Sequence, residues 1–144
     1  MSSIDSESLV LLDTHAWIWL INGDEKLRLS PALPLIEKAT QFSNILISAI
    51  SVWEVSMLEA KGRISFSMEC LDWMKQALAA LGISLVPITP EIAVLSSRLP
   101  GEFHGDPADR IIVATALELS ANLVTKDTKI LRYSESNPLN VIAI

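Results

Sequence analysis

Five acidic residues occupy positions where an alternating strand–helix chain would bring them together. Asp13 directly follows the apolar run 9–12, and Asp127 comes shortly after the apolar run 123–125. Both runs are typical of buried parallel strands, and ligands bind outside the carboxyl ends of such strands in open α/β sheets. Two carboxylates about 5 Å apart repel by roughly 3 kcal/mol at an effective dielectric near 20. A hard divalent cation would remove that cost, so the pattern predicts a metal-dependent enzyme. The five are Asp13, Glu54, Asp106, Asp109 and Asp127.

Two of these acids also have a purely structural interpretation. Asp13 could cap the helix expected over residues 16–20, although Thr14 is an equally good cap. The roles could be divided, with Thr14 capping the helix and Asp13 facing the site. Glu54 could form a capping box with Ser51, which would be worth about 1 kcal/mol. Its place one turn into the helix after the second strand favours a role at the sheet edge that carries Asp13.

The other three acids could serve helix starts as well. Asp106 is expected to cap a helix that begins at Pro107, and this is its predicted main role. Asp109 would then complement the helix dipole in the first turn, and Asp127 could cap the short segment 128–133. A helix N-terminus carries about half a positive charge, so it can also hold several acids around a metal. Capping alone does not explain why all five converge on one edge.

The elements that position these acids alternate along the chain. Strands are expected over residues 9–12, 45–48, 85–88, 123–125 and 141–143. Helix starts are predicted at Ser30-Pro31, Thr89-Pro90 and Asp106-Pro107, and helix ends near Gly23, Gly62 and Gly82. Such alternation indicates βαβ units with right-handed crossovers. We therefore expect a three-layer α/β/α sandwich around a mostly parallel sheet of about five strands.

Length and composition set the outer limits. The 144 residues suit one domain over residues 9–144, after a flexible N-terminal extension over residues 1–8. No apolar stretch is long enough for a membrane span, and the single cysteine, Cys70, excludes an internal disulfide and a thiolate zinc cluster. A reducing cytoplasm is the expected compartment. The net charge of −6 argues against a simple basic nucleic-acid binder, but five of the seventeen acids belong to the predicted site, where cations would offset them.

Four segments in series resemble a known family. They are Leu-Leu-Asp-Thr-His-Ala at 11–16, Ile-Ser-Ala-Ile-Ser-Val-Trp-Glu at 47–54, Asp-Pro-Ala-Asp-Arg-Ile-Ile-Val-Ala-Thr-Ala at 106–116, and Leu-Val-Thr-Lys-Asp at 123–127. Together they are similar to PIN domains, and above all to the VapC-type toxins of bacterial toxin–antitoxin pairs. The resemblance implies an α/β/α fold, dependence on Mg²⁺ or Mn²⁺, and endonucleolytic cleavage of RNA. It also implies a homodimer and inhibition by a small cognate antitoxin.

Site residues follow from the resemblance position by position. Asp13, Glu54, Asp109 and Asp127 match the acidic quartet that holds metal, and Asp106 matches an additional acid of less certain role. Thr14 and Thr125 are candidates for orienting the ligands. Either Asp109 or Glu54 could position the attacking water, and the sequence does not choose between them.

The sequence evidence for substrate contacts by basic residues near the acids is weaker. Arg110, Lys126 and Lys129 could meet RNA phosphates, although solvation is the commoner fate of such side chains. His15 could touch substrate from early in a helix, whereas His104 is expected to be solvated or to belong to a flap.

Two other functions remain open from the residues alone. One is a Mg²⁺-dependent phosphohydrolase or phospho-acceptor domain with Asp13 as nucleophile, although the second acid that haloacid-dehalogenase enzymes carry two positions on is His15 here. The other is a non-catalytic module whose acids bind a basic partner peptide, because arginine makes bidentate contacts with carboxylates.

Overall fold

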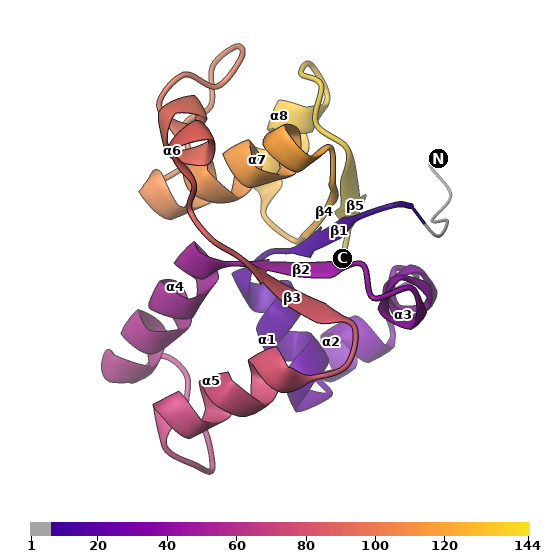
Figure 1. Ribbon diagram of the computed structural model, residues 1–144, viewed down its shortest axis with the longest axis vertical. Helices are drawn as coiled ribbons and strands as arrows, with labels where there is room; N and C mark the ends of the chain where they lie inside the picture. Colours follow the sequence, from indigo (N-terminus) through magenta and orange to yellow (C-terminus); the bar gives the residue numbers. More distant parts are fainter. Residues whose placement is uncertain (1–6) are drawn as a thin grey trace.

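A single parallel sheet organises the molecule. A computed structural model describes residues 7–144, and within this range five strands pair in the order β3-β2-β1-β4-β5 (Figure 1). The strands are β1 (Val10–Leu12), β2 (Ile45–Ser48), β3 (Ile83–Val86), β4 (Asn122–Thr125) and β5 (Val141–Ala143). Every pairing is parallel, which confirms the predicted sheet. The extension predicted over residues 1–8 lies mostly outside the described residues, so the division into extension and domain stays a prediction.

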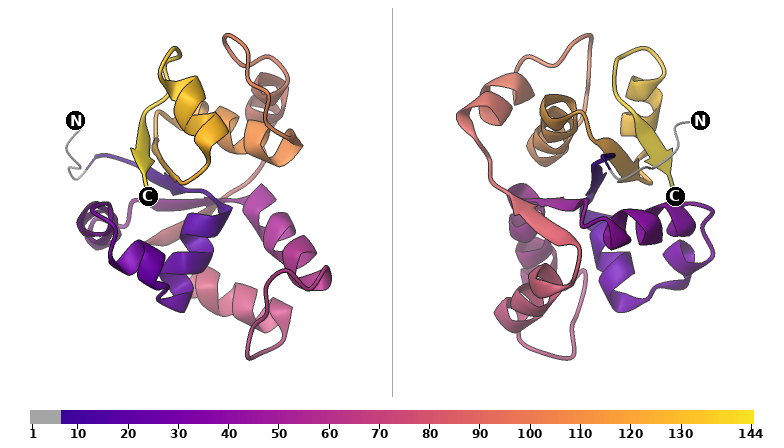
Figure 2. Two further views of the ribbon diagram at one scale, coloured as in Figure 1. Left: turned by 180° about the vertical axis from the view of Figure 1, so that it is seen from behind. Right: turned by 45° about the vertical axis from the view of Figure 1, so that its right-hand side comes forward.

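Helices cover both faces of the sheet, as Figures 1 and 2 show. One face carries α1 (Thr14–Asn22), α2 (Glu25–Arg28), α3 (Leu33–Gln41), α4 (Ala49–Ala60) and α5 (Cys70–Ala79). The other carries α6 (Pro90–Ser96), α7 (Pro107–Leu119) and α8 (Thr128–Ser134). The predicted three-layer α/β/α sandwich is confirmed. Within residues 7–144, no helix combines the length and the apolar character needed to cross a membrane.

The strands alternate their side chains between two apolar cores. Val10 and Leu12 of β1 pack with the fully buried Trp17 of α1 on one face. Leu11, between them, packs with Ile112 of α7 on the other face. Both faces of β1 are therefore buried, which explains why its sequence is an unbroken apolar run.

The order in which strands are added to the sheet reverses at β1. It builds β2 and β3 on one side of β1 and then returns to place β4 and β5 on the other. A crevice at the carboxyl ends of the strands is expected at such a switch point. Asp13 follows β1 and Asp127 follows β4, the two strands that flank the switch.

Three local predictions were wrong. The third strand is residues 83–86 rather than 85–88, because it pairs with β2 directly after Gly82 and leaves Leu85 48% exposed at the sheet edge. Ser30 does not cap a helix that begins at Pro31, since α3 begins at Leu33 without a side-chain cap. The helix after β2 begins one turn earlier than the capping box implied, with Ser48 as its cap. The helix starts at Thr89 and Asp106 are confirmed.

Candidate functional site

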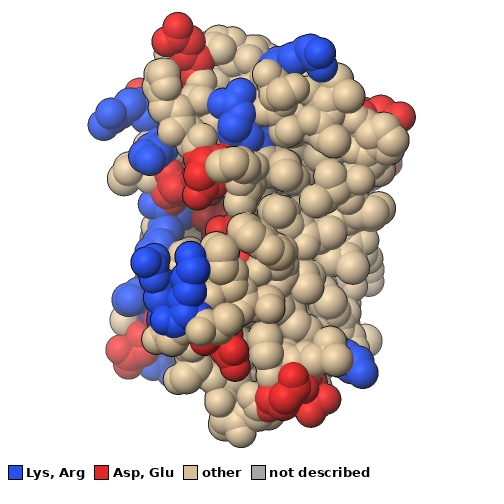
Figure 3. All heavy atoms as spheres, turned by 90° about the vertical axis from the view of Figure 1, so that its left-hand side faces the viewer, with Lys and Arg blue, Asp and Glu red and all other residues tan. Residues whose placement is uncertain are grey.

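A cavity of about 210 Å³ opens at the carboxyl ends of β1 and β4. All five acids singled out from the sequence line it, together with Thr14, His15, Ile112 and Lys126. We call it the acidic pocket. Figure 3 shows this side of the molecule, where acidic side chains gather in a hollow with basic side chains above and below them. The sheet thus assembles residues that are more than 110 positions apart in the chain, as the distance from Asp13 to Asp127 shows.

Asp13 is fixed through both of its carboxylate oxygens. Oδ1 accepts a hydrogen bond from the backbone N–H of Ala16 at 2.8 Å, so Asp13 caps α1. Oδ2 accepts from the hydroxyl of Thr125 at 2.6 Å. Asp13 is only 7% exposed, and this burial raises its pKa despite the lowering effect of both hydrogen bonds. The prediction that Thr14 caps the helix while Asp13 faces the site is wrong, because the carboxylate of Asp13 both caps α1 and lines the pocket.

Glu54 is held by α1 rather than by a capping box. The hydroxyl of Thr14 donates to Glu54 Oε1 at 2.7 Å and lies 2.9 Å from the hydroxyl of Ser51. Ser51 is fully buried inside α4, so it is a contact of Thr14 and not the start of the helix. Burial raises the pKa of Glu54, and the charges of Asp106 and Asp13 raise it further. Thr14 therefore contacts the carboxylate of Glu54, and its role in orienting a ligand stays a prediction.

The start of α7 brings two further acids to the pocket. Asp106 caps the helix by accepting from the backbone N–H of Asp109 at 2.8 Å. Burial raises the pKa of Asp109 to about 7, with further contributions from the charges of Asp106, Asp127 and Glu54. A carboxyl group that titrates near neutral pH is typical of a site in which negative charges are held together.

Asp127 caps α8. Its Oδ1 accepts from the backbone N–H groups of Lys129 at 2.8 Å and Ile130 at 3.2 Å. The backbone N–H of Asp127 donates to the hydroxyl of Thr125 at 3.0 Å, and the same hydroxyl donates to Asp13. Thr125 therefore links the acids at the ends of β1 and β4, although it lies under the pocket rather than in its wall.

The basic residues divide into three groups. Lys126 and His15 line the acidic pocket, which sequence spacing alone did not establish. Lys129 and the exposed His104 line a neighbouring cavity of about 360 Å³. Arg110 has a structural role, because its guanidinium donates to the carbonyls of Ser96 at 2.8 Å and Phe103 at 2.6 Å and so joins α7 to the segment before it.

The donor set of the acidic pocket suits a hard divalent cation. Carboxylate oxygens are the ligands that Mg²⁺ and Mn²⁺ prefer. A carboxylate has about four lone-pair positions, so Asp13 keeps acceptor capacity beyond its two hydrogen bonds. Within residues 7–144, no three acidic, histidine or cysteine side chains are already arranged to hold one ion. Glu54 and Asp109 also line the pocket and are less buried than Asp13.

Comparisons with known proteins agree with this fold. The family model described as PIN domain matches residues 10–136. Ribonuclease VapC22 of Mycobacterium tuberculosis is 36% identical over 132 residues, which make up 92% of this chain and 97% of the relative. The structure also resembles a toxin–antitoxin complex from Klebsiella pneumoniae, with a TM-score of 0.59, 25% identity and coverage of 92% of this chain and 95% of the other. A DNA-bound VapBC from Salmonella typhimurium has a TM-score of 0.67 at 17% identity and covers 94% and 98% of the two chains.

Proposed function

The chain belongs to the PIN domain family, and on this premise we propose that it is a metal-dependent endoribonuclease, the toxin of a toxin–antitoxin pair. The observation that supports this most strongly is the acidic pocket. Three helix starts and one helix interior, far apart in the chain, direct carboxylates and a threonine hydroxyl to one cavity at the switch point of the sheet. Burial raises the pKa values of Asp13, Glu54 and Asp109, neighbouring carboxylates raise them further, and a cation would stabilise the ionised forms.

The proposed ligands of the cation are Asp13, Glu54, Asp109 and Asp127. Nucleases of this family generally depend on a divalent metal, and we propose Mg²⁺ or Mn²⁺ because every proposed ligand is a carboxylate. When bound, such an ion lowers the pKa of a water molecule and offsets the charge that develops on the phosphate.

The protein groups orient the ligands and handle the proton. Thr125 holds Asp13, and Thr14 holds Glu54, each through a hydroxyl hydrogen bond. Asp109 lines the pocket at the start of α7 and is a candidate for positioning and deprotonating the attacking water. Glu54 is the alternative for this step. Asp106 supports the site by capping α7 and by adding negative charge beside Asp109.

The partners proposed for this chain are RNA and a cognate antitoxin protein. The relatives named above include a ribonuclease and toxins in complex with antitoxins. A homodimer is typical of the family, and the cytoplasm is the proposed compartment. The phosphohydrolase alternative receives no support, because a nucleophilic Asp13 would have to attack with a carboxylate that is buried and hydrogen-bonded through both oxygens.

Cleavage of a mixed cellular RNA pool tests the proposal. Purified protein would be incubated with Mg²⁺, with Mn²⁺ and with EDTA, beside the Asp13→Asn variant prepared identically. We expect discrete fragments that require metal and that disappear in Asp13→Asn. Cleavage that continues in EDTA would exclude metal dependence, and cleavage at the wild-type rate in Asp13→Asn would remove this residue from the mechanism. A protein that binds divalent ions and a partner but cuts no RNA would favour the non-catalytic binding module.

A further inference from the structure

Two lysines from different parts of the chain lie over the ring of Trp19. The ammonium nitrogen of Lys26, in α2, is 5.3 Å from the ring centroid. The ammonium nitrogen of Lys126, between β4 and α8, is 5.2 Å from the same centroid. Both distances are within the range of a cation–π interaction. Trp19 therefore brings two positive charges to one aromatic ring.

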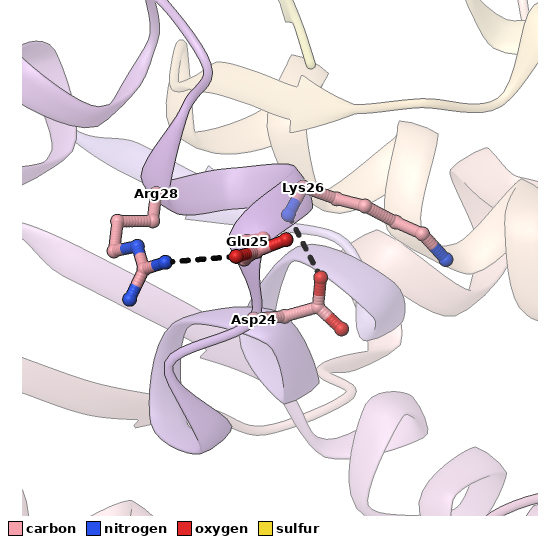
Figure 4. A network of polar contacts seen from close by, with 4 residues as sticks. All are labelled: Asp24, Glu25, Lys26 and Arg28. Carbon is pink, nitrogen blue, oxygen red and sulfur yellow. Dashed lines mark hydrogen bonds and ion pairs between the residues drawn. The ribbon is translucent and has the colours of Figure 1, made fainter.

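Nearby acids do not neutralise these lysines through ion pairs. Figure 4 shows the side chain of Lys26 extending away from Asp24 and Glu25. Glu25 pairs with Arg28 at 3.1 Å, and Asp24 accepts a hydrogen bond from the backbone N–H of Lys26 rather than from its ammonium group. Within residues 7–144, neither Lys26 nor Lys126 forms an ion pair. The two ammonium groups remain available to an anion.

The pair lies at the edge of the acidic pocket. Lys126 lines the pocket and stands between Thr125 and Asp127 in the chain. His15 also lines it, and its ring meets the ring of Trp19 edge-on with the centroids 6.4 Å apart. An anion held by the lysines would thus lie beside the carboxylates of the site.

We propose that Lys26 and Lys126, held over Trp19, form a subsite that binds the phosphate backbone of the RNA strand beside the acidic pocket. This subsite rests on the proposed ribonuclease function and adds the contact that places the strand. An acidic pocket in a chain with a net charge of −6 repels RNA, so local positive charge is needed where the strand approaches. Lysine is a common phosphate binder that acts as a point charge.

Trp19 is a positioning residue in this arrangement. It is half-buried, and both lysines already lie against its ring, so it supports the ammonium groups instead of stacking on a base. Replacement by phenylalanine keeps an aromatic face, although a weaker one, whereas leucine keeps only apolar volume. The two substitutions therefore separate the positioning of the lysines from the packing of α1.

Binding of single-stranded DNA tests the subsite without depending on cleavage. The probe is a fluorescent oligothymidylate of about 10 nucleotides, whose phosphates a ribonuclease leaves intact and whose length suits a single-strand groove. Affinity is measured by anisotropy in Mg²⁺ at several salt concentrations. Each phosphate contact contributes about 0.7 to the slope of log affinity against log salt for single strands.

Lys26→Gln is the main variant, because Lys26 is exposed and is not a lining residue of the acidic pocket. We expect it to lower the salt slope by about 0.7, so that its loss of affinity is about threefold larger at 50 mM than at 200 mM salt. Lys38→Gln on α3, an exposed lysine outside the acidic pocket, is the matched control and should leave the slope unchanged.

Trp19→Leu should lower the slope as Lys26→Gln does, and Trp19→Phe should restore part of it. Equal slopes for the wild type, Lys26→Gln and Trp19→Leu would overturn the subsite, even if the protein cuts RNA. An equal loss in Lys38→Gln would also overturn it, because the effect would then come from net charge. Absence of RNA cleavage with these slope changes intact would instead contradict the ribonuclease and leave a nucleic-acid contact.

Discussion

The helix starts at the acidic pocket and those elsewhere use the same cap in different surroundings. Asp127 accepts from the backbone N–H two residues on at 2.8 Å, and Asp24 makes the same bond at the same distance at the start of α2. Glu69 caps α5 in a similar way. Asp24 and Glu69 lie away from the acidic pocket, however, whereas the caps of α1, α7 and α8 all line it.

The difference shows that the capping of a helix and the convergence of several caps at one pocket have separate causes. A carboxylate at a helix start needs only its own helix, because it satisfies free backbone N–H groups and the helix dipole. The sheet order then decides which caps meet. Asp13 and Asp127 meet because β1 and β4 are neighbours in a parallel sheet. Asp106 joins them although α7 follows a helix rather than a strand, whereas Asp24, at the start of α2, does not line the pocket.

The largest expected effect appears when aspartate is replaced by asparagine at two equivalent helix caps, one in the acidic pocket and one outside it. Asparagine caps helices about as well as aspartate, so Asp127→Asn and Asp24→Asn should both fold. We expect Asp127→Asn to lower RNA cleavage by at least about 100-fold, because groups that only support metal ligands already contribute about 10- to 100-fold. Asp24→Asn should cut at the wild-type rate. Equal rates for both variants would break the distinction between the two kinds of cap.

Thr125→Val should have the next largest effect. The substitution keeps the shape of the side chain but removes the hydroxyl that donates to Asp13 at 2.6 Å and accepts from the backbone of Asp127. We expect Mn²⁺ affinity to fall about 10- to 100-fold. Thr115→Val is the matched control, since Thr115 is also buried but donates to the carbonyl of Ile111 within α7. A similar loss in the control would attribute the effect to stability.

The pH dependence follows from Asp109. Its pKa is raised from 3.8 to about 7 in the metal-free protein, so below pH 7 a cation has to displace a proton. We expect Mn²⁺ affinity to fall about tenfold per pH unit below 7, provided that one proton is displaced. Asp109→Asn should flatten this dependence. Calorimetric titration at pH 6, 7 and 8 measures it, and a wild-type affinity that is constant across this range would contradict the assignment.

Stability of the metal-free protein should change in the opposite direction. Between about pH 4 and 7, folded Asp109 holds a proton that the unfolded chain has already lost. The free energy of unfolding therefore decreases as pH rises through this window, as far as Asp109 contributes. Urea unfolding in EDTA at several pH values would show it, with Asp109→Asn as the variant that should lack this contribution. A wild-type curve that rises through the window as steeply as that of the variant would refute it.

The smallest expected effect is on stability at single caps. Asp24→Ala should lower the free energy of unfolding by about 1 kcal/mol, the usual worth of a cap. Asp106→Ala should cost less than Asp24→Ala, because it loses a cap but also relieves repulsion with Asp109, whose pKa is raised by burial and further by the charge of Asp106. Thermal unfolding in EDTA compares the two, and a larger cost for Asp106→Ala would show that its charge does not destabilise the pocket.

Elements with buried strands and side-chain caps were predictable from the sequence. The strand before Asp13 is apolar on both faces, and Thr89-Pro90 and Asp106-Pro107 begin helices as their types indicate. The predicted bounds of the third strand are two residues too late. The strand lies at the edge of the sheet and leaves Leu85 exposed, so the positions of its apolar residues do not indicate its register.

Asp13, Asp106 and Asp127 were predictable members of the pocket because strand ends and helix caps are local signals. The sequence predicts the cap of α4 at Ser51, because the spacing of Ser51 and Glu54 fits a capping box. In the structure Ser48 is the cap, and both Ser51 and Glu54 contact Thr14 instead. The contacts of Lys26 and Lys126 with Trp19 were not predictable. These contacts join α2, α1 and the end of β4, and no spacing of residues in the sequence indicates that the three elements lie close together.

Titration of metal-free protein with Mn²⁺, followed by the loss of the free-ion signal in electron paramagnetic resonance, tests the central claim most directly. The claim is that the carboxylates of the acidic pocket hold a divalent cation and that equivalent helix caps elsewhere do not. We expect saturable binding by the wild type and by Asp24→Asn, and a large loss in Asp13→Asn. Equal binding by all three proteins would place the cation outside the acidic pocket and contradict the account.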